Sequence, residues 1–121
     1  MLSIKADQRK NLLLVRYRGL IGSDEMQRGL DQIQAALAKL ESGFRVLADL
    51  SELESMDVAC APFIEKAMDL CNEKGASLVV RVIPDPHRDI GLQIMSYFHY
   101  SGDVRFVTCE TLAEAAKILR S

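Results

Sequence analysis

The reactive side chains of this sequence are spaced in ways that argue against catalysis and against a bound metal. His87 and His99 are twelve positions apart, without the short helical spacing or the nearby carboxylates of a helical metal site. The cysteines Cys60, Cys71 and Cys109 form no C-x-x-C pair. An odd number of such cysteines is typical of reduced thiols in a cytoplasmic protein. We therefore predict no metal, no cofactor and a cytoplasmic location.

Cys60 is the strongest candidate for a nucleophile, because it precedes a predicted helix and a helix N-terminus can lower the pKa of a thiol. Its neighbours Val58, Ala59, Ala61 and Pro62 are uncharged and mainly apolar, however. A cysteine in such surroundings usually has a structural role. We therefore expect Cys60 to be inert and the protein not to be an enzyme.

Two further arrangements that could support chemistry are incomplete. Ser51 and Ser55 follow a predicted strand, but no G-x-S-x-G elbow surrounds either, and serines in turns usually bond nearby backbone. Gly19 and Gly22 precede a predicted helix, as glycines of phosphate-binding loops do, but a third glycine and a P-loop lysine are missing. We interpret this stretch as an ordinary turn from strand to helix.

Composition and charge favour one globular domain. The chain has 121 residues, the usual size of a single domain, and 49% of them are hydrophobic. The formal net charge is −2 and no basic stripe is present, so we expect no nucleic-acid partner. No apolar run has the length of a signal peptide or a membrane span. The sequence thus predicts a single domain, residues 1–121, that does not bind membranes.

The elements expected at the start of the chain are a hairpin and a helix. Two extended segments, 2–6 and 12–18, flank a polar turn and predict antiparallel strands. Ser23 is a suitable N-cap for the helix that follows. Apolar residues then recur at steps of three and four, at Met26, Leu30, Ile33, Leu37 and Leu40. Because Gly43 follows, we expect the helix to end shortly before it.

The remaining elements alternate between strand and helix. We predict strands over 44–50, 77–83 and 104–107, and helices over 61–74, from Asp85 to about Tyr97, and after the N-cap Thr111. Ser51 and Ser55 are expected to lie in a loop, and residues 55–60 are expected to form a turn with an irregular end. The order β-β-α-β-α-β-α-β-α predicts an α/β fold with a mixed, mostly parallel sheet.

The third predicted helix has no formally charged residue after Asp89. A helix on the surface normally keeps a charged face, so this one is either wrapped by the protein or offers apolar surface to a partner. We predict that it binds a protein partner or a second copy of the chain. The side chains expected to do so are Leu92, Met95, Tyr97, Phe98 and Tyr100.

Four short motifs occur in the order found in one known family. They are Asp49-Leu50-Ser51, Met56-Asp57, Gly75-Ala-Ser-Leu78 and Thr111-Leu-Ala-Glu114-Ala115. In this order the sequence resembles the STAS family, the domain of bacterial anti-sigma-factor antagonists and of sulfate-transporter tails. The resemblance implies a STAS-like fold and regulation by contact with a protein, of which an anti-sigma-type regulator is one example.

In that family the second serine of an Asp-Ser-Ser-Gly turn accepts phosphate from a partner kinase. Asp57 matches the aspartate, whereas Val58, Ala59 and Cys60 occupy the Ser-Ser-Gly places, so the resemblance implies a partner-binding turn that lacks its phosphoacceptor. Ser51 and Ser55 would lie beside it. Related domains also resemble lipid carriers, which leaves an alternative function, the binding of a small apolar ligand beneath the third helix.

Overall fold

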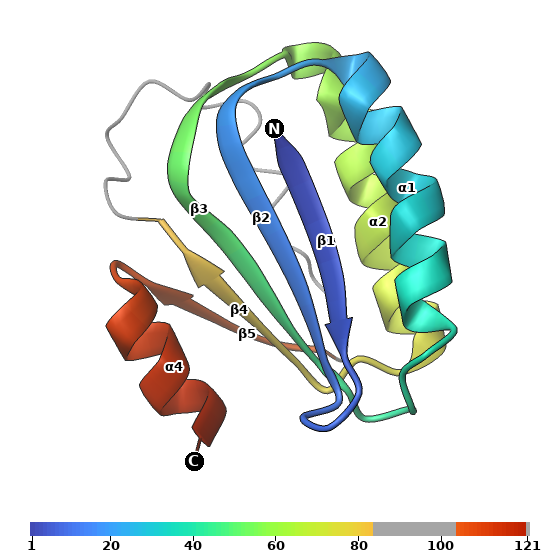
Figure 1. Ribbon diagram of the computed structural model, residues 1–121, viewed down its shortest axis with the longest axis vertical. Helices are drawn as coiled ribbons and strands as arrows, with labels where there is room; N and C mark the ends of the chain where they lie inside the picture. Colours follow the sequence, from blue (N-terminus) through green and yellow to red (C-terminus); the bar gives the residue numbers. More distant parts are fainter. Residues whose placement is uncertain (84–103, 121) are drawn as a thin grey trace.

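The chain forms a five-stranded sheet with helices on both faces (Figure 1). The computed structural model describes residues 1–83 and 104–120. Strands lie side by side in the order β1-β2-β3-β4-β5, with β1 antiparallel to β2 and all other neighbours parallel. Their bounds are β1 Leu2–Asp7, β2 Leu12–Ile21, β3 Arg45–Met56, β4 Leu78–Val82 and β5 Arg105–Cys109. The predicted α/β fold with a mostly parallel sheet is confirmed.

Three α-helices and one 3₁₀ turn complete the described part of the chain. They are α1 Ser23–Leu37, η1 Val58–Cys60, α2 Ala61–Lys74 and α4 Leu112–Arg120. Helices α1 and α2 pack together over one face of the sheet, and α4 lies on the other face, over β3, β4 and β5 (Figure 1). The predicted third helix, with Leu92, Met95, Tyr97, Phe98 and Tyr100, lies outside the described residues.

The alternation of β2 shows how the sequence selects the two faces. Leu13, Val15 and Tyr17 are buried against α1 and α2, at 0%, 4% and 5% exposure. Arg16, which lies between two of them, and Arg18, which follows Tyr17, point to the opposite face, as the two-residue period of a strand requires. The main core therefore lies between the sheet and α1 and α2.

The first helix carries the predicted apolar stripe but differs at both ends. Gly22 is the N-cap and no side chain caps it, so the prediction of Ser23 as the cap is wrong. The helix ends at Leu37, because Lys39 and Leu40 donate their N–H groups to carbonyls only three residues back. These tight turns still bury Leu40 without continuing the helix.

Strand β3 corrects the largest error of the sequence analysis. It was predicted to end at Leu50, but it continues to Met56, so Ser51 and Ser55 lie in a strand and not in a loop. The pairing of β3 with β2 shifts register twice over this stretch. Each shift inserts an extra residue on β3, and the buried residues consequently fall three apart, at Leu50, Leu53 and Met56.

The predicted ends of those later elements that lie in the described residues agree with the structure within two residues. Helix α2 begins at Ala61 with Pro62 in its first turn, and it ends at Gly75, whose φ of 97° favours glycine. The Thr111 hydroxyl caps α4 by accepting from the N–H of Glu114 at 3.2 Å. The Glu114 carboxylate accepts from the N–H of Glu110, at 3.5 Å. In a capping box it would accept from the N–H of Thr111, so the box is not formed.

Candidate functional site

The turn predicted to bind a partner lies where β2 and β3 end. Asp57 follows β3 directly, and its N–H donates to the carbonyl of Ile21, the last residue of β2, at 3.1 Å. The chain then forms η1 and enters α2, close to the start of α1 (Figure 1). In α/β sheets, ligands are bound preferentially at the carboxyl ends of strands. The turn therefore lies at the carboxyl edge of the parallel strands, beside the start of α1.

Asp57 holds the turn in one conformation. Its carboxylate accepts from the N–H of Ala59 at 2.9 Å, and its carbonyl accepts from the N–H of Cys60 at 2.9 Å. An aspartate in this position satisfies N–H groups that the first turn of a helix leaves without partners. The turn is closed by its own backbone and one carboxylate, so its shape does not depend on a ligand.

The three residues of η1 divide between the surface and the core. Val58 and Ala59 are exposed, Val58 to 53%. Cys60 is fully buried, with its Sγ 3.7 Å from the carbonyl oxygen of Ile21. Burial raises the pKa of the Cys60 thiol, and the nearby negative charge of Asp57 raises it further. Cys60 therefore supports the turn from inside as a protonated thiol, in agreement with the structural role expected for it.

The two serines of β3 have different surroundings. Ser51 is half-buried, and its N–H donates at 3.0 Å to the carboxylate of Asp49, which is buried and pairs with Arg16 at 3.1 Å. Ser55 is exposed and pairs with Leu20 of β2. Ser55 thus lies on the surface beside the Asp57 turn, whereas Ser51 is set back along the strand.

Leu20 is the surface residue that the sequence analysis missed. It is 72% exposed, the most exposed large apolar side chain of the described part of the chain. The signal was present in the alternation of β2, which places Leu20 on the same face as Arg16 and Arg18 and away from the core. The interpretation of Gly19 to Gly22 as a turn is wrong, because β2 extends to Ile21. Of these four residues only Gly19, with φ of 64°, takes the left-handed conformation.

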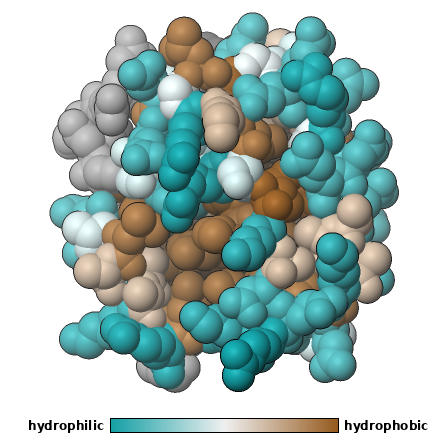
Figure 2. All heavy atoms as spheres, in the orientation of Figure 1, coloured by the Kyte–Doolittle hydropathy of each residue, from teal (hydrophilic) through white to brown (hydrophobic). Residues whose placement is uncertain are grey.

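The charges at this end of the molecule are mostly acidic. Asp24, Glu54 and Asp57 are exposed, and no cation among the described residues pairs with them. Arg18 is paired with Glu52 at 2.6 Å. In Figure 2, apolar side chains reach the surface at the upper edge, with hydrophilic ones beside them.

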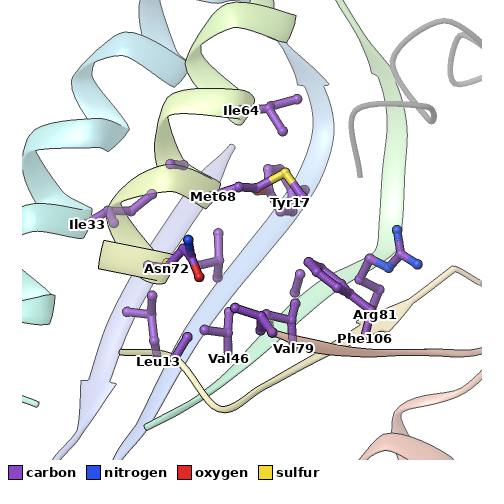
Figure 3. A pocket seen from close by; sticks show the side chains of 16 residues that line it. Leu13, Tyr17, Ile33, Val46, Ile64, Met68, Asn72, Val79, Arg81 and Phe106 are labelled. Carbon is purple, nitrogen blue, oxygen red and sulfur yellow. The ribbon is translucent and has the colours of Figure 1, made fainter. Parts of the chain in front are cut away.

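A small cavity lies between α2 and the sheet (Figure 3). It encloses about 60 Å³ and is lined mainly by apolar side chains, with Asn72 and Arg81 among the few polar ones. The Arg81 guanidinium donates to the Thr108 hydroxyl at 2.7 Å and lies 5.3 Å from the centre of the Phe106 ring, and burial lowers its pKa. Pockets for drug-sized ligands enclose roughly 300 to 1,000 Å³. The cavity is several-fold too small for such a ligand.

Two other tests concern only the part of the chain that the structure describes. In residues 1–83 and 104–120, no group of three His, Cys, Asp or Glu side chains could hold a metal ion. None of the helices there has the length and hydropathy of a membrane span.

Comparisons with known proteins give no match in sequence and a clear one in structure. Neither a protein-family model nor a curated protein matches this sequence. The anti-sigma factor antagonist SpoIIAA in its unphosphorylated form aligns with a TM-score of 0.69 and 13% identity, over 100% of this chain and 99% of SpoIIAA. An uncharacterised Shewanella loihica protein with a SpoIIAA-like fold aligns with a TM-score of 0.68 and 18% identity, over 98% and 92% of the two chains.

A third similar structure is a putative anti-sigma factor antagonist from Thermotoga maritima, with a TM-score of 0.66, 16% identity and coverage of 100% and 96%. Identities this low describe the fold alone. The similarity in fold agrees with the mixed, mostly parallel sheet of this chain. The chain has the STAS-like fold of SpoIIAA and other anti-sigma factor antagonists.

Proposed function

We propose that this protein is a non-enzymatic regulatory module that binds a protein partner through the end of β2 and the turn after β3. The contact residues are Leu20, Ser55, Asp57, Val58 and Ala59, hereafter the turn surface. The observation that carries the proposal is the exposure of Leu20, near the end of β2, and of Val58, on the turn that Asp57 holds, at 72% and 53%. Exposed apolar side chains on a rigid frame lose little conformational entropy on binding and are therefore suited to protein contacts.

The partner is proposed by analogy to be an anti-sigma-type regulator in a bacterial cytoplasm. The fold is that of proteins named anti-sigma factor antagonists, and SpoIIAA has been solved in unphosphorylated and in phosphorylated form. Here Val58, Ala59 and Cys60 offer no hydroxyl, so the turn cannot gain the charge of about −2 that phosphorylation adds. We propose that this module binds its partner in a single, unswitched state.

We also propose a second contact surface, on the third predicted helix. Leu92, Met95, Tyr97, Phe98 and Tyr100 stay predicted residues for a second partner surface or for a homodimer. Light scattering at high concentration tests the homodimer, which requires twice the mass of one chain.

The rival function, binding of a small apolar ligand, has less support. The cavity beneath α2 holds about 60 Å³, enough for a few water molecules and not for a lipid chain. The exposed apolar residues of the described part lie instead on the outside of the molecule.

The proposal is tested by capture of partners from an extract of the host bacterium on the immobilised protein. We expect one protein to be retained by the unmodified chain and lost with the double variant Leu20→Ser, Val58→Ser. The matched control is Leu112→Ser, which removes another exposed leucine, 40% exposed on α4, and should leave capture unchanged. Equal retention by all three proteins, or equal loss with Leu112→Ser, would contradict the proposal.

A further inference from the structure

The turn surface combines apolar side chains with an acidic rim. Leu20 and Val58 are two of the four large apolar side chains that the described residues expose. Asp24 in the first turn of α1, Glu54 near the end of β3 and Asp57 before η1 are all exposed at the same end of the sheet. A partner that covers the two apolar side chains must therefore also meet these carboxylates.

The acidic rim is a local excess of charge. The whole chain has a formal net charge of −2, so its remaining charges nearly cancel. Two described cations at this end of the sheet are already engaged, because Arg18 pairs with Glu52 at 2.6 Å and the Met1 ammonium lies 3.8 Å from Glu25. Asp24, Glu54 and Asp57 are left to set the potential of this surface.

Local structure explains two of these carboxylates but not the third. Asp24 stabilises the positive end of the α1 dipole, and Asp57 caps the turn before α2. Glu54 has neither role, because it is the extra residue of β3 at its second register shift, between Leu53 and Ser55, which pair with Gly19 and Leu20. The register shift leaves Glu54 exposed beside Leu20 without a structural partner among the described residues.

We infer that the partner of the turn surface presents Lys or Arg side chains around an apolar pocket that receives Leu20 and Val58. This inference rests on the proposed function and specifies the chemistry of the partner. The apolar side chains supply contact area that excludes water, and the carboxylates orient and attract a cationic surface. An acidic or uniformly apolar partner is disfavoured, because it would bury Glu54 and Asp57 without compensation.

The inference makes association dependent on salt. Exposed charges act over a Debye length of roughly 10 Å at 0.1 M salt, so attraction between this rim and a cationic partner weakens as ionic strength rises. A complex formed by apolar contacts alone would lack this dependence.

The test uses a synthetic amphipathic peptide of Leu and Lys, of roughly 14 residues, as a probe of the partner's chemistry. A peptide of the same pattern with Glu in place of Lys is the control. The amide NMR spectrum of the protein is recorded during titration with each peptide at low and high salt. We expect the Lys peptide to shift the amides of residues 19–22 and 54–60, less so at high salt, and the Glu peptide to shift none of them.

Two charge reversals separate the rim from general attraction. Glu54→Lys should weaken the binding of the Lys peptide by roughly five-fold, whereas Glu73→Lys, which reverses an exposed charge near the other end of α2, should change it less than two-fold. Equal binding of the Glu peptide, shifts centred elsewhere, or equal effects of the two reversals would overturn the inference. If the host partner is captured through Leu20 and Val58 while the Lys peptide fails, the partner's inferred chemistry is wrong and the proposed function stands.

Discussion

The two ends of the parallel strands differ in how their turns are held and in the side chains that they expose. At the amino end, Asn11 exchanges two side-chain hydrogen bonds with the backbone of Glu41, at 2.9 and 3.1 Å. Arg45 reaches the carbonyls of Lys10 and Leu119, and Ser77 donates to the carbonyl of Gly43 at 2.8 Å. These bonds join the hairpin, the loop before β3 and the last turn of α4. At the carboxyl end, Asp57 closes its own turn while Leu20 and Val58 remain exposed.

This difference indicates that one end of the sheet serves stability and the other serves binding. An end whose polar side chains bond distant backbone is suited to stability, because each such bond joins segments far apart in the sequence. An end that closes locally and exposes apolar side chains is suited to binding. Substitutions at the amino end should therefore change the free energy of unfolding, and those at the carboxyl end should change partner binding.

The largest expected effect comes from Cys71, the buried thiol near the end of α2. Burial raises the pKa of Cys71 from 9.0 to about 12. The folded state keeps the Cys71 proton while the unfolded state releases it above pH 9. The stability is therefore full below pH 9 and is lost as the pH rises toward 12, by up to about 4 kcal/mol.

Urea unfolding at pH 8 and pH 11 of the unmodified protein and of Cys71→Ala checks this expectation. The variant should lose less stability than the unmodified protein between the two pH values. Equal losses of stability in both proteins would show that the Cys71 thiol is open to solvent. The amino end of the sheet would then not be the stabilising end.

The next effect concerns the amino end directly. Asn11→Ala removes both side-chain bonds to Glu41 and places alanine at a φ of 50°, a left-handed conformation that asparagine tolerates better. We expect a loss of about 2 to 3 kcal/mol in the free energy of unfolding, with capture of the partner unchanged below the melting temperature. Asn11→Gly, which accepts this φ, should lose only the part due to the side-chain bonds. Loss of partner capture by a folded Asn11→Ala variant would contradict the assignment of the amino end to stability and the carboxyl end to binding.

The same comparison shows what the sequence could predict. The amino end of the sheet and the helices beside it follow regular periods, so the stripe of α1, the start of α2 and the parallel order were predicted from the sequence. The carboxyl end was predicted less well, because the two register shifts replace the two-residue period of β3 by steps of three, at Leu50, Leu53 and Met56. That spacing is closer to the period of a helix than to that of a strand, and so the extension of β3 was missed.

The sequence pointed to the Asp57 turn through the resemblance of its motif, and it did not point to Leu20. The role of Asp57 follows from the preference of aspartate for the start of a helix, which depends on a few neighbouring residues. Leu20 lies in another strand, more than thirty positions earlier, and joins the surface only through the pairing of β2 with β3. Contacts set by strand pairing depend on register, which local sequence patterns specify only in part.

The smallest expected effect tests whether the turn surface is a switch without its acceptor. Ala59→Ser should change the free energy of unfolding by less than about 0.5 kcal/mol, because Ala59 is exposed and its N–H keeps the bond to Asp57 at 2.9 Å. Cys60→Gly, the matched change at the buried position of the same turn, should cost about 1 to 2 kcal/mol, because it opens a cavity where the structure has φ of −74° and no need of glycine.

Thermal unfolding of the two single variants and of the double variant checks this order, and incubation with labelled ATP and host extract follows. If the turn corresponds to the phosphoacceptor turn of the family, Ala59→Ser should become labelled at residue 59 while the unmodified protein stays unlabelled there. Label at Ser55 in both proteins would show that the acceptor has moved along β3 and that the turn surface still switches. Unfolding of Ala59→Ser would show that residue 59 has no room for a hydroxyl, and the correspondence between the two turns would then be wrong.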